Sequence, residues 1–251
     1  MSGHNRWSKI KRQKAAMGAS KGKLFSKLIK EVTVAARLGG GDPANNARLR
    51  VAISAARDAN MPGDTITRAV KKGTGELEGA AYEEVVYEGY GPGGVAVMVE
   101  CLTDNRNRTA SDVRILFDKN GGSLGSAGAV GWLFQRKGSI AVKPGLAEDA
   151  VMERALEAGA EDVLPAGEHE GYEVRTAAGD LHAVASTLEQ GSLPIAGQRW
   201  VHVPQTLVRV EADAAERFLR LIDALEENED VQNVHANAEL DEAASAAGST
   251  G

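Results

Sequence analysis

Residues 22–38 carry apolar side chains at the three- and four-residue spacing of an amphipathic helix. The apolar side of this helix comprises Leu24, Phe25, Leu28, Ile29, Val32 and Ala36, and the opposite side comprises Lys23, Lys27, Lys30 and Arg37. Three glycines, residues 39–41, end the pattern. The segment therefore predicts a helix that packs on one side and presents cations on the other.

Two shorter amphipathic segments follow and predict two more helices. The first comes after Asp42-Pro43 and directs Leu49, Ala52, Ile53 and Ala56 inward. The second covers residues 62–72. Gly73 follows Lys71 and Lys72 at the position where a glycine commonly ends a helix. Three short helices with small apolar faces predict a small bundle.

The hydrophobic period changes from helix to strand after a polar linker at residues 74–79. Strands are expected at residues 85–90, 95–102 and 129–135. A helix is expected between the last two, at residues 109–120, opened by a capping box between Thr109 and Asp112.

Residues 139–204 have the order β-α-β-β-α-β, which is the split pattern of a ferredoxin-like domain. The expected strands are 140–142, 162–164, 172–176 and 199–203, and the expected helices are 148–157 and 181–189. A helix at 213–226, with Asp213 and Glu216 as a capping pair, and a strand at 231–236 then complete the preceding unit. The ferredoxin-like unit is thus predicted to be an insertion.

The predicted fold class is α+β: an N-terminal three-helix domain followed by two α/β domains, the last ferredoxin-like and inserted in the middle one. A chain of 251 residues is long enough for several cores. The expected divisions are residues 1–78 for a basic arm and helical domain, 79–138 with 205–240 for the middle domain, 139–204 for the insertion, and 241–251 for a disordered polar tail.

Charge is divided sharply between the two ends of the chain. Residues 1–30 contain no acidic side chain, and residues 1–75 hold sixteen Lys and Arg against four Asp and Glu. From chain totals of 29 and 35, residues 76–251 therefore hold 13 basic and 31 acidic residues. The start of the chain is suited to a polyanion, whereas the remainder carries the opposite charge.

The cationic side of the first helix is the strongest functional signal in the sequence. Lys23, Lys27 and Lys30 have no acidic residue within four positions before them, since Glu31 is the first acid of the chain. Like charges on one helix face cost stability unless an anion meets them, although a charge run is usually an ordinary solvated face. The expected nucleic-acid-binding residues are Arg6, Trp7, Lys9, Lys11, Arg12, Lys14, Lys21, Lys23, Lys27, Lys30, Arg37, Arg48, Arg50, Arg106 and Arg108.

Two other motifs have alternative interpretations. The glycine-rich stretch at residues 89–94 resembles a phosphate loop, but a strand rather than a helix follows it, which favours a tight β-hairpin. Arg106 and Arg108 lie near a helix start, where they either form an anion site or pair with Glu88 or Glu100.

No pattern in the sequence indicates an enzyme, a cofactor or a metal site. The five histidines lack metal-ligand spacing, and Cys101 stands in an apolar run without a neighbouring base. An aromatic content of 4% argues against a base-stacking sheet. The single cysteine fits a reducing compartment, and no apolar run could span a membrane. A mitochondrial transit peptide is the less favoured interpretation of the start, because it merges into a helix with a core face.

Several motifs together resemble the YebC/PmpR family of transcriptional regulators. They are residues 2–11 (SGHNRWSKIK), 23–31 (KLFSKLIKE), 39–43 (GGGDP), 87–94 (YEGYGPGG), 104–109 (DNRNRT) and 204–206 (PQT). The resemblance covers nearly the whole chain and implies three domains, a bacterial cytoplasmic protein and no catalytic residues. Residues 192–200, which include Pro194, Arg199 and Trp200, and the tail after Asp241 depart from the family pattern.

The favoured function is a non-enzymatic DNA-binding regulator of transcription, the role that the resemblance implies. The alternative is a ribosome-associated factor that binds ribosomal RNA and relieves stalling, as other family members do. The sequence contains no evident base-reading recognition helix, and a Lys-rich arm suits irregular RNA equally well. A protein-interaction adaptor is the third class. We expect a cytoplasmic protein, a monomer, with no membrane or small-molecule partner.

Overall fold

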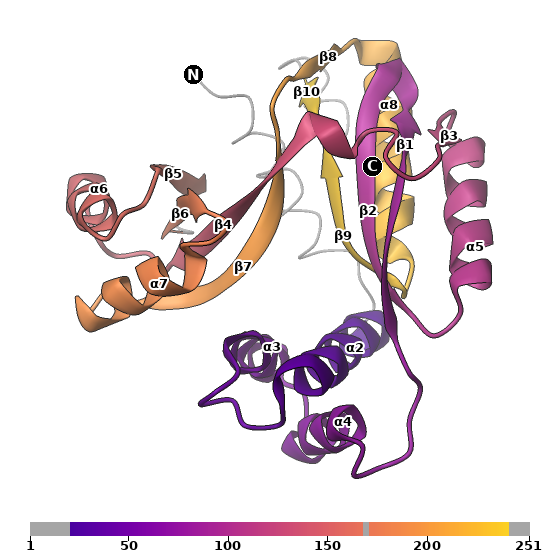
Figure 1. Ribbon diagram of the computed structural model, residues 1–251. Helices are drawn as coiled ribbons and strands as arrows, with labels where there is room; N and C mark the ends of the chain where they lie inside the picture. The colour runs from indigo at the N-terminus through magenta and orange to yellow at the C-terminus, as the bar shows by residue number, and fades with distance from the viewer. Residues whose placement is uncertain (1–20, 168–170, 241–251) are drawn as a thin grey trace. The chain divides into compact units, whose positions relative to one another are not determined.

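The computed structural model describes residues 21–167 and 171–240 (Figure 1). The expected basic arm, with Arg6, Trp7, Lys9, Lys11, Arg12 and Lys14, and the expected polar tail lie outside the described residues. The chain divides into two compact units. Unit 1 contains Gln135–Val203, and unit 2 contains the described residues of Ala16–Phe134 and Pro204–Gly251.

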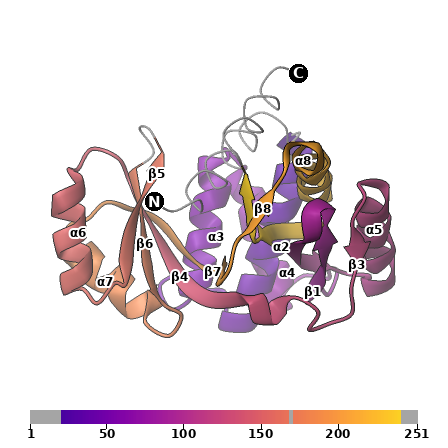
Figure 2. The same cartoon turned by 90° about the horizontal axis from the view of Figure 1, so that it is seen from above.

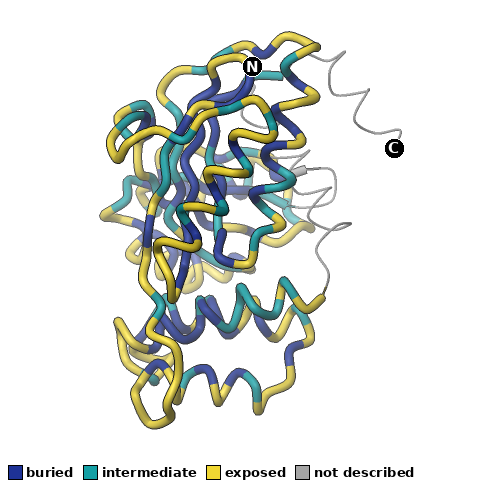
Figure 3. The backbone as a smooth tube through the Cα atoms, turned by 90° about the vertical axis from the view of Figure 1, so that its right-hand side faces the viewer, coloured by how far each residue is buried: buried dark blue, intermediate teal, exposed yellow. Residues whose placement is uncertain are grey.

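The N-terminal part of unit 2 is a bundle of three helices. They are α2 (Lys21–Gly39), α3 (Ala47–Asp58) and α4 (Gly63–Thr74). Their shared core contains Val32, Leu49, Ala52, Ile53, Ala56, Ile66 and Ala69, which confirms these predicted inward positions. Leu24 was also predicted to face inward, but it is 40% exposed. In Figure 3 the buried and exposed colours alternate along these helices, as the amphipathic pattern requires.

Asn46 fixes the turn between α2 and α3. Its side-chain oxygen accepts a hydrogen bond from the Leu49 N–H at 3.0 Å, which caps the start of α3. Its amide nitrogen donates to the carbonyl oxygens of Ala35 and Gly40, each at 2.8 Å, near the end of α2. One buried amide therefore satisfies backbone groups at both helix ends.

Gly73 lies inside α4, and the prediction that it ends this helix is wrong. The left-handed residue is Gly75, at φ +83°. A Cβ atom on Gly73 would come within 2.3 Å of the Thr33 carbonyl oxygen and 2.7 Å of the Ala36 Cβ. The glycine is needed because α4 meets the α2 backbone there, which helix periodicity alone does not reveal.

The second part of unit 2 is a four-stranded sheet in the order β3-β1-β2-β9. Its strands are β1 (Glu83–Gly91), β2 (Val95–Thr103), β3 (Ser123–Leu124) and β9 (Val231–Ala236). The helices α5 (Arg106–Lys119) and α8 (Ala212–Glu227) pack against it, and β8 (Val208–Val210) pairs in parallel with β10 (Ala238–Leu240) (Figure 1).

Both faces of β2 are buried. Val97 lies on the face that meets α8, whereas Ala96 and Met98 pack against Val130 and Phe134 on the other face. Cys101 also lies in this strand, only 2% exposed, and burial raises the pKa of its thiol to about 12. At neutral pH the residue is a buried thiol.

The glycine-rich stretch forms a β-hairpin, as predicted. Gly91 pairs with Val95 in the antiparallel register of β1 and β2, and a short 3-10 turn, Pro92–Gly94, joins the strands. Gly93 and Gly94 have φ of +80° and +75°, a conformation that favours glycine.

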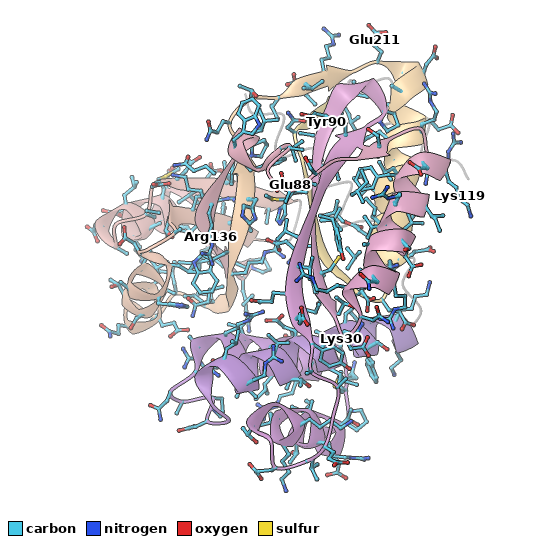
Figure 4. All side chains as sticks on the ribbon, turned by 45° about the vertical axis from the view of Figure 1, so that its right-hand side comes forward. Lys30, Glu88, Tyr90, Lys119, Arg136 and Glu211 are labelled. Atoms are coloured by element: carbon cyan, nitrogen blue, oxygen red, sulfur yellow. The ribbon has the colours of Figure 1, made fainter. Side chains whose placement is uncertain are left out.

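Glu88 on β1 fixes the loop that leads out of this sheet (Figure 4). Its carboxylate accepts hydrogen bonds from the backbone N–H groups of Gly128, Val130 and Gly131 at 2.9, 2.7 and 2.6 Å. Burial alone would raise the pKa of Glu88, but these three bonds outweigh it and the pKa is lowered. The loop is thereby anchored by a charged acceptor.

Three local expectations in this part are wrong. The strand expected at 129–135 begins only at Phe134, as β4, and a 3-10 turn (Gly131–Leu133) precedes it. α5 begins at Arg106, capped by the Asn105 side chain, because the Thr109 hydroxyl is directed to Asp230 instead. In α8, no side-chain capping bond forms at the N-terminus among the described atoms, so Asp213 and Glu216 are not a capping pair.

Unit 1 has the β-α-β-β-α-β order of a ferredoxin-like fold. Its elements are β4 (Phe134–Val142), which begins one residue before the unit, α6 (Glu148–Glu157), β5 (Asp162–Gly167), β6 (Gly171–Ala177), α7 (Leu181–Gln190) and β7 (Ile195–Pro204). The sheet order is β5-β6-β4-β7 (Figure 2). The helices and strands enclose an aliphatic core that includes Ile140, Val151, Val174 and Leu188. The predicted α+β class, with this unit inserted between two segments of unit 2, is confirmed.

Replacing Gly73 with alanine should destabilise the protein by about 1–3 kcal/mol, since the added methyl overpacks the α2–α4 contact. Helix propensity alone predicts the opposite sign, by about 1 kcal/mol. Gly63→Ala is the matched control, because nothing lies within 4 Å of its added Cβ. Denaturant unfolding of both variants measures the difference. A Gly73→Ala protein at least as stable as the Gly63→Ala protein would contradict the close packing.

Candidate nucleic-acid interface

The lysine row of α2, comprising Lys23, Lys27 and Lys30, meets the end of α8 and the turn after it. Lys23 lies 3.8 Å from a carboxylate oxygen of Glu227. The Lys27 ammonium donates to the carbonyl oxygen of Glu226. Lys30 donates to a carboxylate oxygen of Asp230 and, at 3.1 Å, to the carbonyl oxygen of Glu229. The partners of Lys27 and Lys30 lie about 200 positions away in the sequence.

Lys30 is therefore not on an exposed face, which corrects the expectation for this residue. Only 9% of Lys30 is exposed, and it lies at the junction between the three-helix bundle and the sheet (Figure 4). Its ammonium also lies 5.6 Å from the centre of the Tyr82 ring. Lys23 and Lys27 are partly exposed.

The C-terminal end of α8 has a physical need for cations. Its last turn contains no basic residue, so the partial negative charge of its terminal carbonyl groups has no compensation within the helix. Lys27 supplies a positive charge to one of these carbonyls from another element. The lysine row thus acts as a C-terminal cap for α8.

Asp230 lies immediately before β9 and links this strand to α2 and α5. Besides Lys30, its carboxylate accepts hydrogen bonds from Thr109 Oγ1 at 2.7 Å and from the Arg108 guanidinium at 2.9 Å. Its own carbonyl oxygen accepts from the Leu102 N–H at 2.8 Å. Asp230 is 4% exposed, so this carboxylate is a buried charge that is fully paired.

The electrostatics of Asp230 follow from these contacts. Burial alone would raise its pKa, but hydrogen bonds from Lys30, Thr109 and Arg108 outweigh burial and lower the pKa below its ordinary value of 3.8. The carboxylate is therefore ionised at neutral pH, and the pairing stabilises the folded state there.

Arg48 and Arg37 also contact acidic or carbonyl groups. Arg48 binds Glu31 with two hydrogen bonds of 2.7 and 3.0 Å and reaches Glu84 at 2.7 Å. Burial acts against its charge, but these two carboxylates outweigh burial and raise the pKa of Arg48. The Arg37 guanidinium donates to the Tyr82 carbonyl oxygen.

Arg106 and Arg108 are paired with acids, although the partners differ from those expected. Arg108 binds Asp104 and Asp230, each at 2.9 Å, and Arg106 lies 3.8 Å from Glu83. Glu88 instead anchors its loop, and Glu100 accepts from the Asn233 amide at 2.9 Å. The alternative of ion pairing thus describes this corner of the structure better than an open anion site.

An open depression of about 640 Å³ lies beside these pairs. It is lined by Ser26, Ile29 and Lys30 of α2, Tyr82, Asp104, Arg108 and Asp112, and the turn Asn228–Asp230. Its lining contains charged groups of both signs, and most of them form ion pairs with one another. The depression is therefore not a cationic groove.

The exposed cations of the bundle lie elsewhere, on α3 and α4. Arg68, Lys71 and Lys72 occupy positions i, i+3 and i+4 of α4 and are exposed, and Arg57 is exposed on α3. Within the described part of the chain these four side chains form no salt bridge. Lys21 and Arg50 are also exposed; Lys21 lies 5.6 Å from the Phe25 ring, and Arg50 donates to the Pro43 carbonyl oxygen.

Arg57, Arg68, Lys71 and Lys72 were not among the expected binding residues. Their spacing within α4 is a signal that the sequence does carry, but it is weaker than the acid-free first helix. The structure brings Lys23, Lys27 and Lys30 together on one side of α2, as predicted, and places Arg48, Arg106 and Arg108 in ion pairs. Among the described residues, no helix is both long and apolar enough to span a bilayer.

The fold defines a class: a basic three-helix bundle followed by two sheet-containing parts, the second inserted in the first. The model of the TACO1/YebC protein N-terminal domain matches residues 5–76, and that of the TACO1/YebC second and third domain matches residues 82–238. The chain belongs to the TACO1/YebC family.

Similar proteins from bacteria carry regulatory names. A "probable transcriptional regulatory protein" of Myxococcus xanthus is 66% identical over 243 residues, covering 97% of each chain. One of Pelotomaculum thermopropionicum is 55% identical, covering 96% of this chain and 100% of its own. The crystal structure of a conserved hypothetical protein from Aquifex aeolicus matches with a TM-score of 0.82 at 51% identity, covering 88% of this chain and 91% of that one. The chain is thus a regulator of this family, in keeping with the expected class.

Replacing Lys30 with methionine should lower the free energy of unfolding by about 3 kcal/mol, because it removes one partner of a buried ion pair. Lys23→Met is the matched control in the same row. Its partly exposed pair with Glu227 should contribute less than about 1 kcal/mol. Chemical unfolding at neutral pH compares the two variants, and equal losses would contradict the special role of Lys30.

The cost of Lys30→Met should also depend on pH. The pKa of Asp230 is lowered on folding, so its pairing contributes stability above pH 3.8 and loses it as the pH falls through the lower folded value. The difference between wild type and Lys30→Met should therefore shrink below pH 3.8. A difference that stays constant into that range would rule out the Asp230 charge as its source.

Proposed function

We propose that this protein is a non-enzymatic regulator that binds DNA through its phosphate backbone, using the three-helix bundle and the basic residues that precede it. The observation that carries the proposal is the separation of charge, sixteen basic against four acidic residues in 1–75 and the reverse excess thereafter. The regulatory names of the relatives support a nucleic acid as the partner.

The exposed cations of α3 and α4 form the part of this surface that needs no rearrangement. Arg68, Lys71 and Lys72 share one side of α4 and form no salt bridge among the described residues. Phosphate groups are the ligands that such a row of cations favours, and binding to them releases counterions. Lys21, Arg37 and Arg50, together with the arm at Arg6, Trp7, Lys9, Lys11, Arg12 and Lys14, extend the proposed surface.

The composition of α3 and α4 favours contacts to phosphate over contacts to base edges. Neither helix contains Asn or Gln, the residues that read adenine with two hydrogen bonds. Backbone contacts position a protein but do not specify a sequence. This observation favours the second candidate function, a translation factor that binds ribosomal RNA, as much as it does a promoter-binding protein.

Other parts of the proposal rest on the family and on composition. The names of the relatives are those of regulatory proteins rather than enzymes, and we propose no catalytic residue, cofactor or metal. A reducing compartment fits the single buried cysteine, so we propose the cytoplasm as the site of action.

Reversing the charge of Arg68, Lys71 and Lys72 to glutamate should weaken nucleic-acid binding by at least about tenfold and reduce the dependence of affinity on salt. For duplex DNA the slope of log K against log salt should fall by about 0.9 for each lost phosphate contact. Fluorescence anisotropy over a salt series measures both quantities.

The matched control reverses three exposed cations of the middle part, Arg114, Lys119 and Arg217. It changes the net charge equally and should leave the salt slope within error of the wild type. Equal weakening by both triple variants would show that net charge, rather than the α4 surface, governs binding.

Crosslinking in cells followed by sequencing of the bound nucleic acid distinguishes DNA from ribosomal RNA. Enrichment of promoter DNA is the result expected for the transcription role. Recovery of ribosomal RNA without promoter enrichment would replace that role with the translation role. Recovery of neither nucleic acid would overturn the proposed function as a whole.

A further inference from the structure

The lysine row of α2 is chemically suited to phosphate, yet in this structure it is occupied by groups of the same chain. Two backbone carbonyl oxygens and two carboxylates, from residues 226–230, contact the three lysines. Carbonyl and carboxylate oxygens are the hydrogen-bond acceptors that a phosphate oxygen would replace. The same lysines thus have two mutually exclusive partners available.

We propose that residues 226–230, here called the acidic cover, are an intramolecular competitor for nucleic acid, and that a phosphate backbone displaces them from Lys23, Lys27 and Lys30 when it binds. The inference rests on the proposed nucleic-acid function and adds a regulatory step to it. The protein then has a covered state, which is the structure described above, and an open state with a larger cationic surface.

The contact between the bundle and the cover is polar, which allows separation at moderate cost. The bundle has its own apolar core, built from α2, α3 and α4 residues between Phe25 and Val70. Its links to the sheet include the three lysine contacts, the Arg37–Tyr82 hydrogen bond and the Arg48–Glu84 ion pair. Parts that are joined by polar contacts and have separate cores are expected to move relative to one another.

The acidic cover contains no basic residue that could balance its negative charge. Glu226, Glu227, Glu229 and Asp230 lie within five residues, and the last turn of α8 carries no basic residue. The lysine row provides the positive charge that this end of α8 lacks, and a phosphate backbone offers the lysines a stronger negative field. Only open molecules bind through the lysine row, so the apparent association constant is the intrinsic one multiplied by the fraction of molecules that are open.

The test is the affinity of Asp230→Asn for a labelled duplex DNA and for a single-stranded RNA of equal length, over a salt series. The variant keeps the shape of the side chain but removes the charge that holds Lys30. We expect binding about tenfold tighter than wild type. The salt slope for DNA should stay close to that of the wild type, because the same lysines contact phosphate once the cover has been displaced. If the variant binds only one of the two nucleic acids more tightly, that nucleic acid is the one that displaces the cover.

Two controls isolate the cover. Asp112→Asn removes one negative charge from the lining of the same depression but lies outside the acidic cover, so it should leave affinity and salt slope nearly unchanged. Adding Lys27→Gln and Lys30→Gln to Asp230→Asn should abolish the gain. Circular dichroism and thermal unfolding confirm that the compared variants are folded.

Hydrogen exchange on the wild-type protein provides a second measurement that does not depend on a variant folding. Binding of the same DNA or RNA should speed amide exchange in residues 226–231, because the cover loses its lysine contacts. Unchanged affinity in folded Asp230→Asn, or slower exchange of 226–231 on binding, would overturn the cover.

Failure of the cover is distinguishable from failure of the proposed function. If the α4 triple variant loses affinity while Asp230→Asn matches wild type, the protein binds nucleic acid without opening. If no variant and no wild type binds either nucleic acid, the proposed function and the cover fall together.

Discussion

The buried ion pair between Lys30 and Asp230 is the interaction on which the arrangement of unit 2 depends. Taking two charges out of water is costly, and the cost is recovered only when every remaining hydrogen-bonding position is filled. Asp230 meets this condition by accepting from Lys30, Thr109 and Arg108 at once. The pair therefore joins the first helix of the bundle, the start of α5 and the start of β9 at a single point.

This constraint explains why the charge asymmetry of the chain does not simply produce one cationic and one acidic surface. Part of the positive charge of α2 compensates the acidic end of α8, whereas Arg57 of α3 and Arg68, Lys71 and Lys72 of α4 are exposed and form no salt bridge among the described residues. The bundle keeps a separate apolar core, and the lysine row, Arg37 and Arg48 add polar contacts to the rest of unit 2. A surface built in this way can respond to an external polyanion and to salt.

Membership of the TACO1/YebC family agrees with this organisation. The two family models divide between residues 76 and 82, at the passage from the bundle to β1. The structure adds to the family assignment by naming the residues that tie the two parts together. It also separates cations available for a partner from cations engaged within the chain.

Local periodicity determined most of the elements, because the spacing of apolar residues within a short segment defines the apolar side of a helix or strand. The helices over 22–38 and 148–157 and the strand over 231–236 were predicted to within a residue or two. The errors arose where a distant element decides: Gly73 is needed by the backbone of α2, and Thr109 gives its hydroxyl to Asp230 rather than to a cap. The candidate site shows the same division. The sequence by itself determined that α2 has a packed side and a lysine side, whereas only the tertiary structure decided that Lys30 meets Asp230, because that partner lies 200 residues away along the chain.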